Sequence, residues 1–421
     1  MSLLRRDMLR GMSAAAVAAA APAFARTSAD DALKIALDSL GALPDYPQRL
    51  ARLAAFDTAA LSSSARIDLL TVVRALEIDA RLADLVPGGK RDGPYRLPAG
   101  AAPGDEAYAL LLERHIGAPS DPGTAHGRLA REAARLTARA DRLMRSLGHG
   151  RGTVGTRYKA LFADRRHHYP DSDSGRDALV ADMNRWLDAG RAQVGALVGP
   201  LLPPSSDVSV RRMTRTEEAE GKSGYRRMPA AGASGAYLVD LKRIADRPRW
   251  SLESVVHHET LPGHMVQLPI ETAAGAHPLR IAYLPVFSEG WAVHAEQMMA
   301  DHGTYRGNPL GELGHIHWLL FRVVRGLVDV GIHHRRWSLA AARGQLDMLQ
   351  GVPAYFAGFE SDLDRIARDP AVRAAEALLW LGLADFTRGR RGASLRLANR
   401  GILEHGRKPL RLLDRNFVGA A

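Results

Sequence analysis

The segment VVHHETLPGHMVQ, from Val255 to Gln267, sets two histidines and a glutamate around a proline and a glycine. A zinc-binding helix commonly carries H-E-x-x-H, in which the two histidines are four residues apart and share one face. Here the fourth residue after His258 is Pro262, and the next histidine is His264. On an unbroken helix His258 and His264 would lie about 240° apart around the axis and would not share a metal ion. The segment therefore predicts a metal site only if the helix is interrupted between these histidines.

The dipeptide Pro262-Gly263 supplies such an interruption. Proline lacks a backbone N–H, and its ring clashes with the carbonyl four residues earlier, which belongs to His258. Glycine adopts backbone conformations that other residues avoid, so it allows the chain to turn back toward His258. We expect the break to bring His264 to His258. Glu259 would then lie beside the ion as the base that takes a proton from a water molecule.

A third ligand is predicted further along the chain, in the segment SEGWAVHAE. Its first glutamate is Glu289, and Glu296 follows seven residues later on the same face of a helix. Glu289 is the candidate ligand, and Glu296 is placed to orient a ligand histidine through a hydrogen bond. Two histidines and one carboxylate leave a fourth position for water, as in catalytic zinc sites. The alternative is that both glutamates are solvated residues of an exposed face, and their spacing leaves both interpretations open.

A second helix, HIHWLLFRVVRGLVDVGIHHRRW, is apolar nearly all round and is therefore predicted to be buried. Its main interior polar residues recur at offsets of 3, 7 and 11 positions, close to one stripe: Arg322, Arg325, Asp329 and His333. Buried charges are costly unless they are paired or used. The stripe is predicted either to line a polar cavity, with Asp329 behind the ligands, or to form an internal network of ion pairs.

The rest of the chain predicts a mainly α fold. Apolar residues recur at helical spacing in three long segments, at 65–85, 127–147 and 176–202, and a loop rich in proline and glycine covers 87–105. Two strand candidates, VSVRRMT from Val208 and GAYLVDL from Gly235, lie just before the histidine motif. We expect one domain over residues 26–421. Residues 26–150 would form a helical lid or N-terminal part, and residues 151–421 would carry the metal site.

The first 25 residues are typical of an export signal. Arg5 and Arg6 precede a short alanine-rich stretch that ends in Ala23-Phe24-Ala25, an A-x-A cleavage site. Paired arginines are typical of the twin-arginine route. The apolar stretch is shorter than the roughly 20 residues that cross a bilayer. We expect cleavage near Ala25 and a periplasmic or secreted protein without stable membrane insertion.

The composition excludes several classes of function. The chain has no cysteine, so disulfides, thiolate metal sites and a cysteine nucleophile are excluded. Without the expected signal, which holds three arginines and one aspartate, the chain carries 54 basic and 45 acidic residues, a formal charge of +9. The arginines are spread along the predicted helices rather than gathered in one basic arm, which argues against nucleic acid as a partner. The expected partner is a peptide or another small amide substrate.

Three separated motifs, HETLPGHMVQ, SEGWAVHAE and LVDVGIHHRRW, occur in an order that resembles the bacterial family known as domain of unknown function 885. The resemblance covers roughly Thr156 to Asp364. It implies a mostly helical fold around a deep cleft, similar to helical zinc peptidases with a glutamate ligand. By position, the resemblance implies one zinc ion with ligands His258, His264 and Glu289, a general base at Glu259 and a cleft histidine at His333.

The chain departs from the usual family pattern at three positions. It has Met265 after the motif histidine, where the family has a second histidine. His294 replaces the tyrosine of the E-G-W-A-x-Y motif, and Phe359 aligns with a later tyrosine, although Tyr355 is close in sequence. These differences leave the metal ligands intact. They change the hydroxyl donor that would face the transition state.

The sequence therefore predicts an exported zinc-dependent hydrolase and favours a peptidase. His333 or His294 would stabilise the oxyanion, and Arg322 or Arg325 would hold a substrate carboxylate, with Tyr355 as a further substrate contact. Two alternatives stay open. One is a zinc-dependent hydrolase of other amides or esters in cell-envelope fragments. The other is a zinc-stabilised envelope protein that binds a ligand without turnover, which the lost tyrosine favours.

Overall fold

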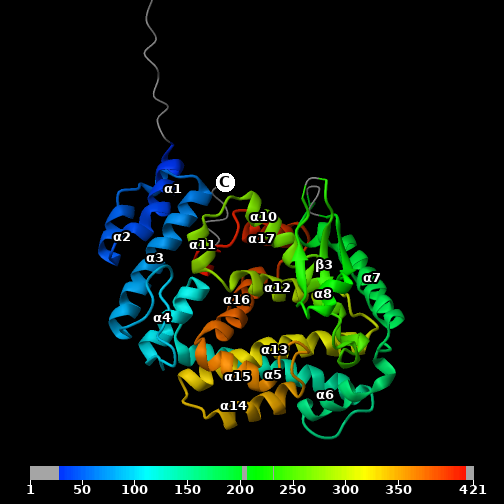
Figure 1. Ribbon diagram of the computed structural model, residues 1–421. Helices are drawn as coiled ribbons and strands as arrows, with labels where there is room; N and C mark the ends of the chain where they lie inside the picture. The colour runs from blue at the N-terminus through cyan, green and yellow to red at the C-terminus, as the bar shows by residue number, and fades with distance from the viewer. Residues whose placement is uncertain (1–27, 202–205, 231, 414–421) are drawn as a thin grey trace, which may run out of the picture.

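The structure is a computed structural model that describes residues 28–201, 206–230 and 232–413. The expected export signal, residues 1–25, lies outside the described residues. Most of the described chain is helical, as the sequence predicts, and the strands form one small sheet (Figure 1). No helix in the described ranges combines the length and the apolar character that crossing a membrane requires.

The N-terminal part is a group of helices joined by short loops, and the loop from Val86 to Gly104 is the longest of these connections. Its helices are α1 (Ala29–Ser39), α2 (Tyr46–Leu53), α3 (Ser63–Leu85), α4 (Asp105–Ile116) and α5 (Pro122–Ser146). Helix α5 buries one apolar face against α13 (Pro309–His333), far along the chain. The packing of α5 makes the N-terminal part a support for the helix that carries the predicted arginine stripe.

The middle of the chain adds two helices and the sheet. Its elements are α6 (Val154–Ala163), α7 (Asp173–Leu197), β1 (Val208–Arg212), α8 (Arg215–Ala219), β2 (Tyr225–Arg227) and β3 (Gly235–Val239). Strand β3 lies in the centre of the sheet, parallel to β1 and antiparallel to β2. The structure confirms both predicted strands. It adds β2, which the sequence did not indicate because this strand is only three residues long and lies in a loop rich in glycine and charge.

The C-terminal part is helical again and contains both motif segments. Its helices are α9 (Glu253–Glu259), α10 (His264–Ala273), α11 (Pro278–Tyr283), α12 (Phe287–Asp301), α13 (Pro309–His333), α14 (Leu339–Gln345), α15 (Phe359–Arg368), α16 (Val372–Thr387) and α17 (Gly392–Leu403). A π-helical turn, Leu346–Gln350, continues α14, and a 3-10 turn, Arg249–Ser251, leads into α9.

Helix α13 lies at the centre of this arrangement and is buried along nearly its whole length, as its uniformly apolar sequence predicts. It packs against both α5 and α16 (Figure 1). Helix α12 packs against α9 and α16. A continuous core of buried side chains runs through these contacts. The helices that carry the histidine motif, α9 and α10, are therefore held in place by their packing against α12, and α9 also packs against α13.

Candidate metal centre

The helix that carries the first histidine is interrupted at the predicted place. Helix α9 ends at Glu259 and α10 begins at His264, so the connection includes the Pro262-Gly263 dipeptide. The peptide bond before Pro262 is cis. A Cβ atom on Gly263 would lie 2.0 Å from the carbonyl oxygen of His258 and 2.4 Å from that of His257. Because no real Cβ atom tolerates such distances, the turn requires glycine at position 263, and the predicted helix break is confirmed.

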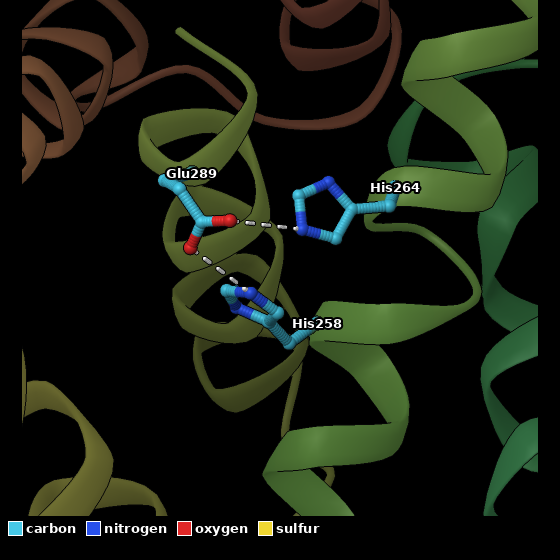
Figure 2. Close-up of side chains that lie close together, drawn as sticks. All are labelled: His258, His264 and Glu289. Carbon is cyan, nitrogen blue, oxygen red and sulfur yellow. Dashed lines mark ion pairs between the residues drawn. The ribbon is translucent and has the colours of Figure 1, made fainter. Parts of the chain in front are cut away.

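The interruption brings three predicted ligands to a common point, as Figure 2 shows. Nε2 of His258 lies 3.5 Å from Oε2 of Glu289, and Nε2 of His264 lies 3.6 Å from Oε1 of the same carboxylate. Ligand atoms about 2.0–2.1 Å from a tetrahedral zinc ion lie about 3.4 Å from one another. Each nitrogen therefore lies at a distance from the carboxylate that suits zinc, and the three ligand atoms lie within 4.8 Å of one another, with donor types that zinc prefers.

A glutamate behind His258 fixes the orientation of its ring. The buried carboxylate of Glu296 accepts a hydrogen bond from Nδ1 of His258 at 2.8 Å, as the seven-residue spacing from Glu289 predicts. The other oxygen of Glu296 accepts a hydrogen bond from Oγ of Ser254 at 2.5 Å. Ser254 also lies 3.1 Å from Nδ1 of His315. With its proton on Nδ1, His258 presents the lone pair of Nε2 to the centre.

His264 is held in the same way by residues that the sequence analysis did not single out. Nδ1 of His264 lies 3.0 Å from Oγ of Ser288, and this hydroxyl donates a hydrogen bond to Oε1 of Gln267 at 2.8 Å. Because the hydroxyl proton is used on Gln267, the ring must donate from Nδ1. Nε2 of His264 is buried without a hydrogen-bond partner among the described residues and faces Glu289. Ser288 directly precedes Glu289 in the sequence, and this position is the signal that could have identified it.

The electrostatics of the centre are dominated by its charged neighbours. Burial by itself raises the pKa of Glu289, but Arg322 and the two histidines outweigh it and hold the pKa well below its usual range. Burial lowers the pKa of His258, but hydrogen bonds to Glu289 and Glu296 outweigh burial and raise that pKa to about 9. Burial lowers the pKa of His264. Without an ion, the ionised carboxylate of Glu289 thus lies between the more basic imidazole of His258 and the less basic imidazole of His264.

Arg322 is the cation nearest to the ligands. Its Nη1 lies 3.1 Å from Oε2 of Glu289, and its Nη2 lies 3.4 Å from Nε2 of His258. Unlike the buried histidines, the Glu289 side chain is about a third exposed (34%). The centre therefore opens toward a cavity on the side of Glu289 and Arg322. Structural zinc sites are closed, so this centre differs from them.

The predicted base lies at the end of α9, next to His258 in sequence. Glu259 forms an ion pair with Arg226, which lies on β2. Strand β2 pairs with β3 in a register that sets Arg226 opposite Tyr237. No sequence pattern indicates this contact, because Arg226 lies 33 positions before Glu259 in a segment rich in glycine and charge. The small sheet thus supplies the residue that fixes the carboxylate of Glu259.

A cavity of about 300 Å³ opens in front of the centre. His258, Glu259, Glu289 and Glu296 line one part of it, and the remaining lining residues are Val255, Trp318, Phe321, Arg322, Arg325, Tyr355, Phe356, Arg365, Arg373 and Glu376. None of the lining residues belongs to the N-terminal helices, so a lid formed by residues 26–150 is not part of this cavity wall. Tyr355 lies in the wall as predicted, with the guanidinium of Arg247 3.8 Å from its ring centroid.

Two predicted catalytic histidines lie elsewhere. Nε2 of His333 donates to the carbonyl oxygen of Ile366 at 2.8 Å, and its ring stacks on Tyr108. Nε2 of His294 donates to Oδ1 of Asn399 at 3.2 Å. Both rings are buried and neither lines the cavity. The assignment of His294 and His333 to the oxyanion is therefore corrected: both side chains join helices together.

The rest of the arginine stripe is mostly internal. The carboxylate of Asp329 accepts three backbone N–H groups at the start of α16, from Ala371, Arg373 and Ala374, and the hydroxyl of Tyr108. Asp329 thus anchors α16 and is not a neighbour of the metal ligands. Nη2 of Arg325 pairs with the buried carboxylate of Asp362 at 3.0 Å. Arg325 lines the cavity, but its guanidinium is already paired with Asp362. The prediction that Arg325 holds a substrate carboxylate is therefore wrong, and the residue forms a structural ion pair.

The comparisons with known proteins support the fold described above. A model of the family described as "Bacterial protein of unknown function (DUF885)" matches residues 14–416. None of the curated proteins compared with the chain matches it. A solved structure described as a "putative lipoprotein" from Colwellia psychrerythraea is 20% identical with a TM-score of 0.65, covering 93% of this chain and 74% of that one. Another, described as a "putative lipoprotein of unknown function" from Shewanella oneidensis, is 16% identical with a TM-score of 0.60, covering 92% and 72%.

Proposed function

From the premise that this chain belongs to the DUF885 family of bacterial proteins, we propose that it is a zinc-dependent hydrolase that cleaves peptide bonds. The observation that carries this proposal is the meeting of His258, His264 and Glu289 at the edge of a cavity, with Glu259 beside them. When bound there, zinc supplies an acidified water molecule and polarises a carbonyl group.

Residues of the chain carry out proton transfer and orient the candidate ligands. Glu259, held by Arg226, accepts the proton of the attacking water and passes it to the leaving amine. Glu296 and Ser288 hold the two ligand histidines in the tautomer that leaves Nε2 unprotonated. These three carboxylate and hydroxyl groups are in place before a substrate arrives, which lowers the cost of reaching the transition state.

The oxyanion is stabilised by groups other than the predicted histidines. Arg322 presents a guanidinium directly beside the ligands, where negative charge develops on a carbonyl oxygen. Tyr355 lines the same cavity, and burial raises the pKa of its hydroxyl, so that it remains a hydrogen-bond donor at neutral pH. Tyr355 thereby supplies the hydroxyl that His294 and Phe359 do not.

Export to the cell envelope is part of the proposal. The N-terminal residues have the pattern of a twin-arginine signal. Both solved structures named above are described as a "putative lipoprotein", which supports an envelope location. The same centre would also act on other amides or esters of envelope fragments. A purely structural zinc site is disfavoured, because Glu289 opens onto the cavity.

Replacing the base tests the reaction. Glu259→Gln keeps the shape of the side chain but removes the proton acceptor, so we expect peptide cleavage to fall at least about 100-fold. Zinc content, measured by metal analysis after dialysis, should stay at one ion per chain because Glu259 is not a ligand. Cleavage is measured on a mixed library of peptides, other amides and esters, which also identifies the bond that is cut.

The control is Glu220→Gln, which changes an exposed glutamate in the same part of the chain. It should leave both zinc content and cleavage unchanged. If Glu259→Gln cleaved peptides as fast as the unmodified protein, the role of this residue would be wrong. If the purified protein bound zinc and a ligand but turned over no member of the library, the binding-protein alternative would replace the hydrolase.

A further inference from the structure

The charged groups of the cavity are almost all paired with other groups of the protein. Four arginines and four glutamates line it: Arg322, Arg325, Arg365, Arg373, Glu259, Glu289, Glu296 and Glu376. The lining therefore has a formal charge of 4 − 4 = 0, and a bound divalent ion raises it to +2. Because opposite charges attract strongly in a partly closed cavity, the loaded site favours a substrate that brings negative charge.

Three of the four arginines have carboxylate partners. Arg322 pairs with Glu289 and also lies 3.8 Å from Glu376, and Arg373 pairs with Glu376. Arg325 pairs with Asp362, from behind the cavity wall. These guanidiniums neutralise charges of the protein itself. Arg325 and Arg373 therefore have little capacity left for a substrate carboxylate, and Arg322 is already assigned to the oxyanion.

Arg365 differs from the other three. It lies on α15, is half-buried and lines the cavity, yet its guanidinium has no hydrogen bond or ion pair with any part of the chain that the structure describes. Asp362, one turn earlier on the same helix, already holds Arg325. A guanidinium in a cavity with no protein partner is available to bind a carboxylate in the bidentate geometry that arginine prefers.

Next to these charges the cavity has an aromatic wall. Trp318 and Phe321 belong to a buried apolar cluster with Val255, and the partly buried Tyr355 packs against this cluster. Phe356 stacks on Trp318 with ring centroids 6.3 Å apart. Phe356 is 54% exposed, which is unusual for a large apolar side chain, and it lines the cavity. This wall offers packing to an apolar side chain of the substrate.

We propose, building on the hydrolase function proposed above, that Arg365 binds the C-terminal carboxylate of the substrate. The substrate class is then a peptide with a free C-terminus and an apolar side chain beside it, cut close to that end. A volume of about 300 Å³ is at the small end of the range for ligand cavities, which suits the end of a chain rather than a long internal stretch. The arginine clamp predicted from the sequence thus moves from α13 to α15.

Binding without turnover tests this assignment. The zinc-loaded Glu259→Gln protein and the metal-free unmodified protein are titrated by calorimetry with N-acetyl-Ala-Phe and with its C-terminal amide. In both proteins the free acid should bind about 10- to 100-fold more tightly than the amide, as expected for one charge-assisted bidentate contact. Arg365→Gln should remove this preference and leave binding of the amide unchanged, and Arg365→Lys should restore part of it.

The matched control is Arg368→Gln, which changes an exposed arginine one turn further along α15. It should keep the full preference for the free acid. In turnover, Arg365→Gln should raise KM for free-acid peptides while kcat changes little, which a merely structural residue would not produce.

Two results would overturn the assignment. One is a preference for the free acid that survives Arg365→Gln. The other is an amidated peptide with an internal glutamate that binds as tightly as the free acid through Arg365, because the anion recognised would then be a side chain. The calorimetry does not depend on catalysis. If Arg365→Gln lost the preference for the free acid but Glu259→Gln still cleaved peptides, only the hydrolase mechanism would be refuted. If Glu259→Gln were inactive but Arg365→Gln kept the preference, only the role of Arg365 would be refuted.

Discussion

Glu296 decides which nitrogen of His258 faces the candidate metal centre. Its carboxylate is buried, accepts Nδ1 of His258 and is itself fixed by Ser254. Glutamine at this position would keep an acceptor oxygen but lose the negative charge that makes the imidazole a strong ligand. The basicity of this candidate ligand is thus set by a residue outside the candidate ligand set.

We therefore expect Glu296→Gln to weaken zinc binding about 10- to 100-fold, measured by competition with a chromogenic chelator. Glu220→Gln serves as the surface control and should bind zinc like the unmodified protein. Equal zinc affinity in Glu296→Gln and the unmodified protein would mean that the hydrogen bond to His258 has no part in holding the ion.

At the same scale, the sequence predicted residue identity better than residue role. The candidate ligands His258, His264 and Glu289 meet as expected, because the break between α9 and α10 returns His264 to His258. Glu296 reaches His258 because the spacing along α12 sets it on the same face as Glu289. Arg226 and Arg365 were not singled out. Neither has a local pattern that distinguishes it from the many other arginines of the chain.

At the scale of elements, the break between α9 and α10 is the condition for the centre. Gly263 passes within contact of two carbonyl oxygens at the end of α9, so that a methyl group there would force the turn apart. The position of His264 relative to His258 depends directly on this turn. A substitution at Gly263 should therefore affect metal binding and folding together.

We expect Gly263→Ala to lower the free energy of unfolding by more than about 2 kcal/mol and to abolish stoichiometric zinc binding. Denaturant unfolding and zinc titration measure the two effects. Gly195→Ala, in an exposed position within α7 with open space around it, should instead leave zinc binding intact and stabilise the helix by about 0.5–1 kcal/mol. Normal zinc binding by Gly263→Ala would show that the close approach is not needed.

The arginine stripe of α13 shows where an element-level pattern stops being informative. Its members lie near one face, yet His333 is 11 residues beyond Arg322, about 16 Å further along the helix axis. Over that length α13 passes from the metal centre to the start of α16, where Asp329 binds backbone N–H groups. Both alternatives raised for the stripe are thus true of different turns.

At the scale of the whole molecule, the ligands tie together three helices. His258, His264 and Glu289 come from α9, α10 and α12, and α12 is packed in turn against α16. A zinc ion that binds only the folded chain must stabilise it by mass action. The ion should therefore act on the thermal unfolding of the chain and not only on local geometry.

With free zinc at about 100 times its Kd, the stabilisation is about 2.7 kcal/mol, which corresponds to a rise in Tm of about 3 °C for a chain of this size. Differential scanning calorimetry of the metal-free and zinc-loaded protein measures the shift. His264→Ala, which removes a ligand, should show no shift under the same conditions. An equal shift in this variant would place the stabilising ion somewhere other than this centre.

The sequence by itself determined the helical fold, the strands β1 and β3, the break at Pro262-Gly263 and the identity of three candidate ligands. Each of these follows from interactions between residues close in the chain: the period of apolar positions, the missing proline N–H and the spacing of side chains on one helix. These forces act in the same way wherever the helix is finally packed.

Only the tertiary structure decided which charged residues face the cavity. Arg226 reaches Glu259 through the register of β2 against β3, and His294 and His333 are turned into helix contacts. Arg365 has no side-chain partner within residues 28–201, 206–230 and 232–413. These outcomes depend on how distant helices dock. Docking is set by the fit of whole packed surfaces, which no local pattern encodes.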